Sequence, residues 1–132
     1  MNELILVVDD EPKIVKLARD YLEQSGFRVM TADDGITALA VAHHERPDLI
    51  VLDLKLPGMD GLELLAAIRR QNMQAPVIVM TAFGTIEVAV QAMKSGAVDF
   101  LLKPFSLDHL MAVVQKALEV RALRDENRKL RE

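Results

Sequence analysis

The sequence contains no cysteine, which excludes disulfide bonds and thiolate metal sites. It has no apolar run near the ~20 residues that a membrane span needs. Its first residues, Met1-Asn2-Glu3-Leu4, lack the basic region that opens a signal peptide. Basic residues are not in excess, and the net charge of -4 argues against broad nucleic-acid binding by this segment. We therefore expect a cytoplasmic protein with no membrane contact.

What is present indicates one globular domain of 132 residues, with a 51% apolar share. Apolar segments typical of strands alternate with segments whose apolar residues recur at helical spacing. The expected strands cover residues 4–8, 27–31, 49–52, 76–81 and 98–102, and the expected helices begin near Pro12, Gly35, Leu62, Gly84-Thr85 and Ser106.

Five short strand-helix units predict an α/β fold, (βα)5, with a doubly wound parallel sheet covered by helices on both faces. The segment 27–31 is the most polar strand and therefore belongs at an edge, whereas the apolar strands are buried on both faces. This pattern favours the flavodoxin-like strand order 2-1-3-4-5, whose switch point lies between the first and third strands.

Polar residues follow four of these strands and should meet at the carboxyl edge of the sheet, where ligands bind in open α/β folds. Each also has an ordinary alternative role: the acidic run after the first strand could cap a helix, and the others could serve turns. Their joint occurrence favours a functional site. The residues are Asp9 and Asp10, Asp53, Thr81 and Lys103.

Three adjacent carboxylates repel one another, and a divalent cation relieves that repulsion. Oxygen ligands without His or Cys select a hard ion, and Mg²⁺ suits a small carboxylate set. A cation, a lysine and a hydroxyl are the groups that stabilise a transferring phosphoryl group. Because the chain has no Gly-rich phosphate loop, we infer that a carboxylate itself accepts the phosphoryl group, and Asp53 is the best candidate.

Four motifs resemble those of the response-regulator receiver (CheY-like) domains of two-component systems, and the likeness covers residues 3–120. They are Val7-Val8-Asp9-Asp10-Glu11, the segment Asp53-Leu54-Lys55-Leu56-Pro57-Gly58-Met59-Asp60-Gly61, Met80-Thr81-Ala82, and Phe100-Leu101-Leu102-Lys103-Pro104-Phe105. The resemblance implies a signalling phosphoacceptor, not an enzyme in its own right, although it assists its own phosphotransfer and dephosphorylation.

The resemblance also implies a role for each matching residue. Asp53 would accept the phosphoryl group from a phosphohistidine of a sensor histidine kinase. Asp10, Asp53 and the backbone carbonyl of Lys55 would ligate Mg²⁺, with Asp9 acting directly or through water. The phosphoryl oxygens would be bound by Thr81, Lys103 and the backbone N–H of Ala82. Phe100 matches the switch aromatic, and the Lys103–Pro104 peptide bond is expected to be cis.

Lys55 and Phe83 stand where such domains flank the path of the hydrolytic water, so they are expected to tune the phosphoryl lifetime. Lys55 could also pair with a carboxylate of the unphosphorylated site. A phosphohydrolase with an aspartyl-phosphate intermediate is the less favoured alternative, because Lys55 stands where haloacid-dehalogenase-like families need a second Asp. A pseudo-receiver would lack part of the acidic pair or the lysine, and a flavodoxin would not end its first strand in acids.

The last helix is longer than a receiver needs. We expect a receiver domain over residues 1–118 and an extended C-terminal helix as a linker over 119–132, the possible start of a coiled coil to a missing output domain. The tail and the segment 84–100 together resemble the receivers of NtrC-like transcription activators, in which an AAA+ module and a DNA-binding module follow. We expect homodimerisation through this helix and DNA contact only through the absent module, and the alternative is a stand-alone receiver or one with another output. The a/d positions are Val120, Leu123, Asn127 and Leu130.

Overall fold

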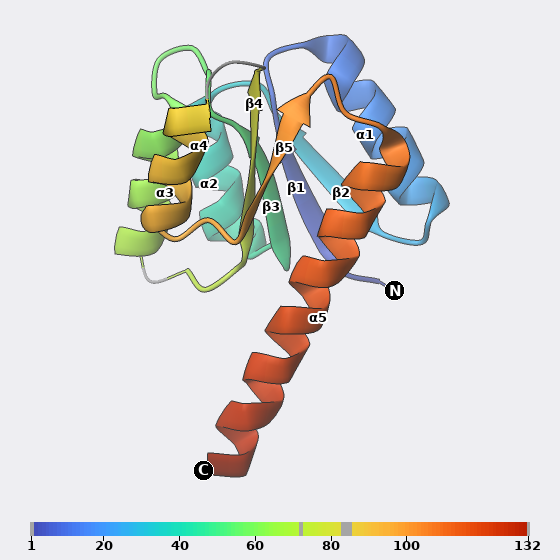
Figure 1. The fold of residues 1–132 in the computed structure, drawn as a ribbon, viewed down its shortest axis with the longest axis vertical. Coiled ribbons are helices and arrows are strands. Elements are labelled where there is room, and N and C mark those ends of the chain that lie inside the picture. The colour runs from blue at the N-terminus through green and yellow to red at the C-terminus, as the bar shows by residue number, and fades with distance from the viewer. Residues whose placement is uncertain (1, 72, 83–85, 132) are drawn as a thin grey trace.

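The computed structural model describes residues 2–71, 73–82 and 86–131, with side chains up to residue 124. Five parallel strands form one sheet in the order β2-β1-β3-β4-β5, which confirms the predicted topology (Figure 1). The strands are β1 (Leu4–Val8), β2 (Arg28–Ala32), β3 (Leu49–Asp53), β4 (Val77–Ala82) and β5 (Asp99–Lys103). The helices are α1 (Pro12–Gln24), α2 (Gly35–Glu45), α3 (Gly61–Arg70), α4 (Ile86–Lys94) and α5 (Leu107–Arg131).

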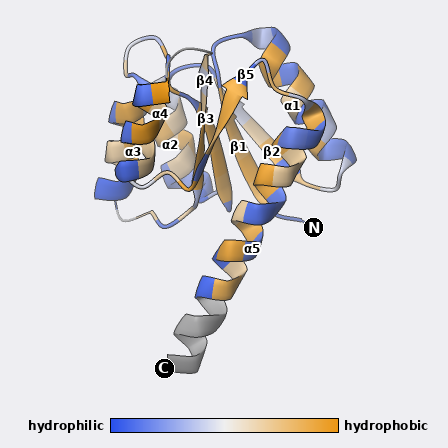
Figure 2. Ribbon diagram, in the orientation of Figure 1, coloured by the Kyte–Doolittle hydropathy of each residue, from blue (hydrophilic) through white to orange (hydrophobic). Residues whose placement is uncertain are grey.

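The helices cover the sheet in two layers, α1 and α5 on one face and α2, α3 and α4 on the other (Figure 1). Alternate strand residues enter opposite cores because side chains alternate across a strand. Ile5 and Val7 of β1 pack against Leu22 and Val114, whereas Leu6 lies in the core on the opposite face. Figure 2 shows an apolar sheet covered by helices in which polar and apolar residues alternate along the chain.

Strand β2 lies at the edge of the sheet, as its polar pattern predicted, and its middle residues are only half-buried. Four strands end one residue later than predicted, and β2, β4 and β5 also begin one residue later. β2 runs to Ala32, β3 to Asp53, β4 to Ala82 and β5 to Lys103, because the ladders pair Val8 with Ala32, Asp53 with Met80 and Ala82 with Lys103. Backbone pairing, which the side-chain pattern does not report, sets these ends.

Helix starts follow ordinary capping rules. Pro12 occupies the first turn of α1, and the side chain of Ser106 accepts the N–H of His109 to cap α5. The predicted start of the fourth helix at Gly84-Thr85, and Phe83, lie outside the described residues. Past the body of the domain, α5 continues as one helix to Arg131 (Figure 1). Among the described residues, no helix has both the length and the apolar character of a membrane span.

Candidate functional site

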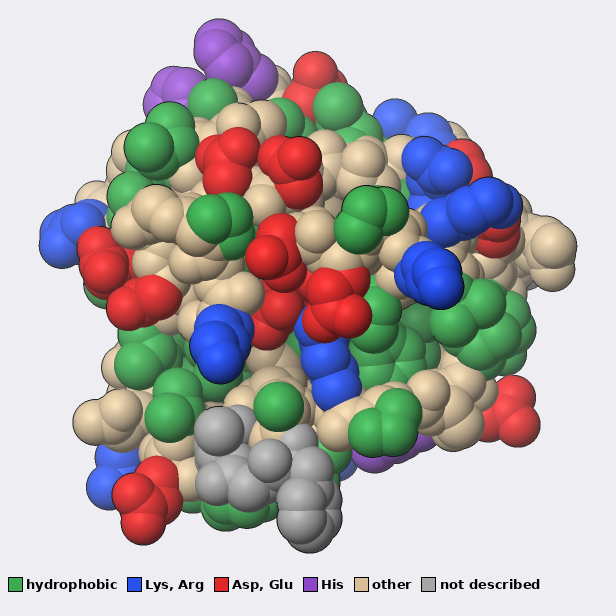
Figure 3. Space-filling model, turned by 90° about the horizontal axis from the view of Figure 1, so that it is seen from above, with side chains coloured by type: hydrophobic (Ala, Val, Ile, Leu, Met, Phe, Trp, Pro, Cys, Tyr) green, Lys and Arg blue, Asp and Glu red, His purple; other side chains and the backbone are tan. Residues whose placement is uncertain are grey.

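The carboxyl edge of the sheet brings together the three predicted aspartates. Asp53 is the last residue of β3, and Asp9 and Asp10 follow β1, its neighbour across the switch point. One carboxylate oxygen from each lies within 4.8 Å of the others. Asp9 and Asp53 are buried and Asp10 is exposed, so the cluster opens to solvent on one side. Figure 3 looks onto this edge and shows acidic side chains gathered at its centre.

Backbone N–H groups hold two of these carboxylates in place. Oδ1 of Asp9 accepts the N–H of Glu11 at 2.9 Å, and Oδ1 of Asp53 accepts the N–H of Lys55 at 3.0 Å. In both residues the second oxygen, Oδ2, is left to face the cluster. Glu11 is the N-cap residue of α1, but its side chain makes no capping hydrogen bond. The side chain of Glu11 therefore does not act as a helix cap.

Lys103, the last residue of β5, places its ammonium group among the acids. Its Nζ lies 2.7 Å from Oδ2 of Asp9, 3.0 Å from Oδ2 of Asp53 and 3.1 Å from Oε1 of Glu11. Burial alone would lower the pKa of Lys103, but the contacts with Asp9 and Asp53 outweigh it and raise that pKa well above its ordinary value. The amine therefore stays charged. The Lys103–Pro104 peptide bond is cis, as expected.

The cluster keeps an excess of negative charge despite Lys103. Burial raises the pKa of Asp9, and the charge of Asp53 acts in the same direction, against the contact with Lys103 and the N–H of Glu11. Oδ2 of Asp9 is fully buried, and its contact with Lys103 at 2.7 Å is an ion pair that leaves a second lone pair of this oxygen for another cation. A buried carboxylate oxygen with an unused lone pair, beside two further carboxylates, fits a hard divalent cation.

A cavity of about 290 Å³ opens beside Asp53, toward β4 and α4. Thr81 is buried in its wall and Ala82 is exposed at its rim. Lys55 is exposed, and no ion pair joins it to a carboxylate among the described residues. Phe100 is half-buried and packs against the core formed with α2, α3 and α4. The cavity is lined by Glu11, Asp53, Leu54, Lys55, Thr81, Ala82, Val88 and Lys103.

Two residues contribute to this edge although the sequence argument assigned them no role of their own. Glu11 forms an ion pair with the ammonium group of Lys103, which also contacts Asp9 and Asp53. Its position directly after the acidic pair could have indicated this role. Gly61 begins α3 against the backbone of Leu54, to which it donates a hydrogen bond of 3.0 Å. The feature of the sequence that could have indicated this role is the position of Gly61 directly after Asp60, the residue that caps α3.

The fold and the site define a doubly wound α/β protein with an acidic, lysine-bridged cluster at its switch point. The chain belongs to the response regulator receiver domain family, which it matches over residues 5–115. It is 46% identical to the nitrogen assimilation regulatory protein NtrX of Azorhizobium caulinodans, covering 97% of this chain and 29% of that protein. It is 37% identical to sporulation initiation phosphotransferase F of Bacillus subtilis, covering 92% of this chain and 98% of that protein.

Solved structures agree with this assignment. The crystal structure of NtrX from Brucella abortus in complex with ADP superposes with a TM-score of 0.95 at 42% identity, over 100% of this chain and 30% of that one. The predicted similarity to receivers of NtrC-like activators is thereby confirmed. The chain spans less than a third of the length of NtrX, so the activity of a whole regulator is not established for it.

Proposed function

We propose that this chain is the phosphoacceptor domain of a two-component response regulator, with Asp53 as the acceptor. The convergence of Asp53 with Asp9, Asp10 and Lys103 at the switch point carries the proposal. Asp53 suits the role best because it stands on a central strand, has Oδ1 fixed by a backbone N–H, and lines the cavity beside β4. Asp9 lacks such access because its side chain is fully buried.

The transfer needs a donor with a labile phosphoryl group, and a phosphohistidine of a sensor histidine kinase supplies one. An oxygen of Asp53 forms a bond to phosphorus as the bond from phosphorus to the histidine nitrogen breaks. The electron pair stays on that nitrogen, which takes up a proton from solvent. The product is an aspartyl phosphate, an acyl phosphate that water can later hydrolyse.

Asp9, Asp10, Asp53 and the backbone carbonyl of Lys55 would hold Mg²⁺. Bound there, the ion neutralises charge on the carboxylates and on the transferring group. The chain's own part is to provide donors for the phosphoryl oxygens. In this proposal Lys103 shifts its ammonium from the Asp9–Asp53 pair to the incoming group, and Thr81 and the N–H of Ala82 donate from the opposite wall of the cavity.

Phosphorylation would act by shifting the population between two conformations of the domain. Thr81 moves toward the phosphoryl group, Phe100 rotates inward, and the surface of α4, β5 and α5 rearranges. Two observations support this route: Phe100 is only half-buried, and α4 exposes Ile86, Val90 and Met93 along one side. A surface that exposes this much apolar area is suited to exchange partners.

The proposal extends to the helical linker and to the output module that would follow it. We infer a receiver over residues 1–118 and a helical linker over 119–132 that dimerises and continues to an output module acting on transcription. DNA contact would come only through that module, and the exchange with the kinase would take place in the cytoplasm. Leu123 supports dimerisation because it is 61% exposed on the extended helix. Val120, a second predicted seam position, is half-buried and lines two cavities at the base of α5. Asn127 and Leu130, the remaining two, lie outside the residues whose side chains are described.

Intact mass spectrometry tests the acceptor role. The protein is incubated with Mg²⁺ and a small acyl-phosphate donor, alongside Asp53→Asn and the control Asp33→Asn, which removes an exposed carboxylate outside the cluster. We expect one phosphoryl adduct on the wild type and the control, and none on Asp53→Asn or after chelation of the metal. An adduct that persists in Asp53→Asn, or the absence of an adduct with every donor, would contradict the proposal.

A further inference from the structure

A second, oppositely charged hollow lies at the amino edge of the sheet, at the far end of the strands from Asp53. A cavity of about 260 Å³ adjoins one of about 490 Å³ at the base of α5, where the helix leaves the body of the domain. The two share much of their lining and so form one elongated groove, which we call the amino-edge groove. The shared residues are Gln74, Pro76, Val98, Ala117, Val120 and Arg124.

The amino-edge groove is basic in a protein whose net charge is -4. Arg46 and Arg121 line its first part, Arg69 and Lys116 line its second, and Arg124 lines both. Against them stand Asp99 in the lining and Asp48, which pairs with Arg121. Positive charge therefore exceeds negative charge along the length of the groove.

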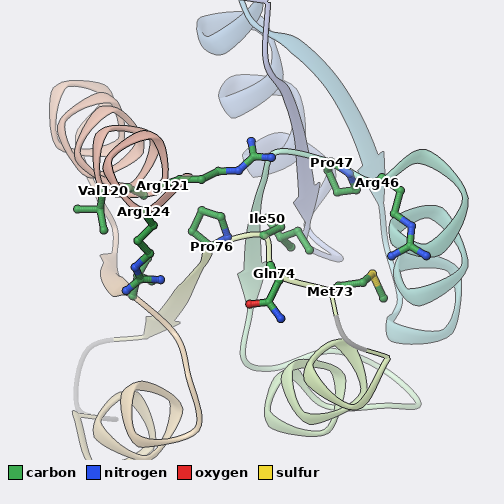
Figure 4. Close-up of a pocket in the computed structure, with 12 residues that line it drawn as sticks. Arg46, Pro47, Ile50, Met73, Gln74, Pro76, Val120, Arg121 and Arg124 are labelled. Carbon is green, nitrogen blue, oxygen red and sulfur yellow. The ribbon is translucent and has the colours of Figure 1, made fainter. Parts of the chain in front are cut away.

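The basic side chains come from three separate elements of the fold. In Figure 4, Arg121 and Arg124 extend from α5 on one side, Arg46 lies on the other, and Pro47, Ile50, Gln74 and Pro76 lie between them. Arg46 ends α2 in the left-handed conformation, with a φ of 49°. The groove thus combines a cationic rim with an apolar floor.

Arg69 adds a charge that the surrounding structure holds in place. Its guanidinium donates to the carbonyls of Met73, Ala75 and Gly96 at 2.9–3.1 Å, and no carboxylate among the described residues pairs with it. Burial lowers the pKa of Arg69, and the nearby charge of Arg124 lowers it further. Two guanidinium groups thus lie close enough to repel each other, and an anion between them would relieve that repulsion.

We propose that the amino-edge groove binds an elongated anion that carries two or more phosphate groups. An elongated ligand fits because the cations are spread along the groove instead of converging on one point. Phosphate groups fit because four of the five cations are arginines, whose planar fork binds phosphate oxygens in pairs. Inorganic polyphosphate and nucleoside polyphosphates share this chemistry.

An anion in the amino-edge groove would also contact the extended helix. Arg121 and Arg124 lie on α5 beyond residue 118, whereas Arg46 follows α2 and Arg69 ends α3. An anion bound across them would join the departing helix to two connections of the body. The groove would thereby fix the direction in which α5 leaves the domain, independently of whether Asp53 is phosphorylated.

Backbone amide NMR titration with tripolyphosphate tests the proposal on the whole chain. The titration is run at constant ionic strength in chloride, with a chelator present so that no metal occupies the acidic site. We expect saturable shifts of the amides at 46, 48–50, 74, 75, 77 and 120–124, and none at 9–11. Shifts that never saturate, or that spread evenly over the surface, overturn the proposal.

Variants assign the effect to the groove. Arg46→Gln combined with Arg124→Gln should weaken binding at least about tenfold, because charge-assisted hydrogen bonds are the strong ones. Lys13→Gln combined with Arg70→Gln removes the same charge from exposed positions outside the groove and should bind as the wild type does. Equal affinity in the two double variants overturns the proposal.

Two further ligands identify the chemistry. Tighter binding of adenosine triphosphate than of tripolyphosphate would show that the apolar floor holds the nucleoside, and equal binding would point to the inorganic anion. Both results support a polyphosphate site. A glutamate oligomer of matched charge that binds as tightly as tripolyphosphate would contradict the assignment to phosphate.

Discussion

Gly61 occupies the position where α3 begins directly against the end of β3. A Cβ at this position would lie 2.4 Å from the Cα of Leu54 and 2.7 Å from the carbonyl oxygen of Asp53. Real Cβ atoms do not approach backbone atoms so closely, and backbone cannot move aside as a flexible side chain can. The absence of a side chain at Gly61 therefore keeps the backbone after Asp53 in the position that holds its carboxylate.

We expect Gly61→Ala to lower the free energy of unfolding by about 3 kcal/mol, at the upper end of ordinary overpacking, and to slow phosphorylation of Asp53. Urea unfolding and the intact-mass assay measure the two effects. Gly58→Ala is the matched control, since its Cβ meets nothing within 4 Å and only its φ of 79° causes strain. The same loss in both variants would show that the contact with β3 is unimportant.

The residues of the acidic site were predictable because their placement depends on chain order and strand ends alone. Once the strands are parallel and ordered 2-1-3-4-5, Asp9, Asp10, Asp53 and Lys103 must share an edge. The contact of Lys103 with Glu11 was not predictable, because it depends on side-chain rotamers at the surface of the site. The close approach of Gly61 was hidden for a similar reason, since it depends on the angle at which α3 meets β3.

At the scale of elements, side-chain bonds at the amino edge tie helices to the ends of strands. Oδ2 of Asp48, just before β3, accepts the N–H of Leu4 at 2.8 Å, and its Oδ1 pairs with Arg121 of α5 at 2.5 Å. Burial alone would raise the pKa of Asp48, but the N–H of Leu4 and the charge of Arg121 outweigh it and lower that pKa. The ionised carboxylate thus links β1 to the start of the α5 extension.

A lowered pKa makes this contribution to stability depend on pH in a definite direction. It is complete above the unfolded-state value of about 4 and is lost as the pH falls through the lower folded-state value. We expect Asp48→Asn to reduce the free energy of unfolding by about 1–2 kcal/mol near neutral pH, with the deficit shrinking below about pH 4.

Urea unfolding at several pH values measures this deficit, with Asp33→Asn as an exposed control. A deficit that grows in acid would contradict the role given to Asp48.

Arg69 also ties a helix to neighbouring segments at the amino edge, as Asp48 does for α5. Its guanidinium joins the end of α3 to the turns before β4 and after α4. Arg69→Met keeps the apolar stem but leaves three carbonyls without their donor, so we expect a loss of about 2–3 kcal/mol in unfolding free energy. Arg70→Met, at an exposed position of the same helix, should change it by less than about 0.5 kcal/mol. Thermal or urea unfolding that fails to separate the two variants would refute this.

The elements themselves were more predictable than their boundaries and their links. Apolar runs and helical spacing located the strands and helices that the structure describes, but four strands end one residue later than predicted because backbone pairing continues there. The carbonyl bonds of Arg69 had no signal in the sequence, because a single arginine near a helix end is equally typical of a solvated side chain.

At the scale of the whole molecule, the domain is polarised along its strands. Acidic groups gather at the carboxyl edge and basic groups at the amino edge, and α5 leaves from the basic end. The phosphorylation site proposed here is therefore remote from the point where the helix departs. In the proposed mechanism, a signal from Asp53 would have to cross the sheet or travel along the α4–β5–α5 face to reach it.

Association through α5 is the prediction that belongs to this scale. Sedimentation should show a dimer for the full chain and a monomer for a version that ends at Leu118. Leu123→Lys in the full chain should also shift the equilibrium to monomer, because it places a charge on the exposed apolar position of the extended helix. If all three proteins sediment as monomers, or all as dimers, α5 is not the dimer contact.

The most direct measurement of the phosphoacceptor claim is chemical trapping of the modified residue. The protein is treated with an acyl-phosphate donor and Mg²⁺, reduced with borohydride, which converts an aspartyl phosphate to homoserine, and then mapped by peptide mass spectrometry. We predict homoserine at position 53 alone, and only when Mg²⁺ is present. Modification at another aspartate, a phosphoryl group recovered on a histidine, or an unmodified position 53 would contradict the claim.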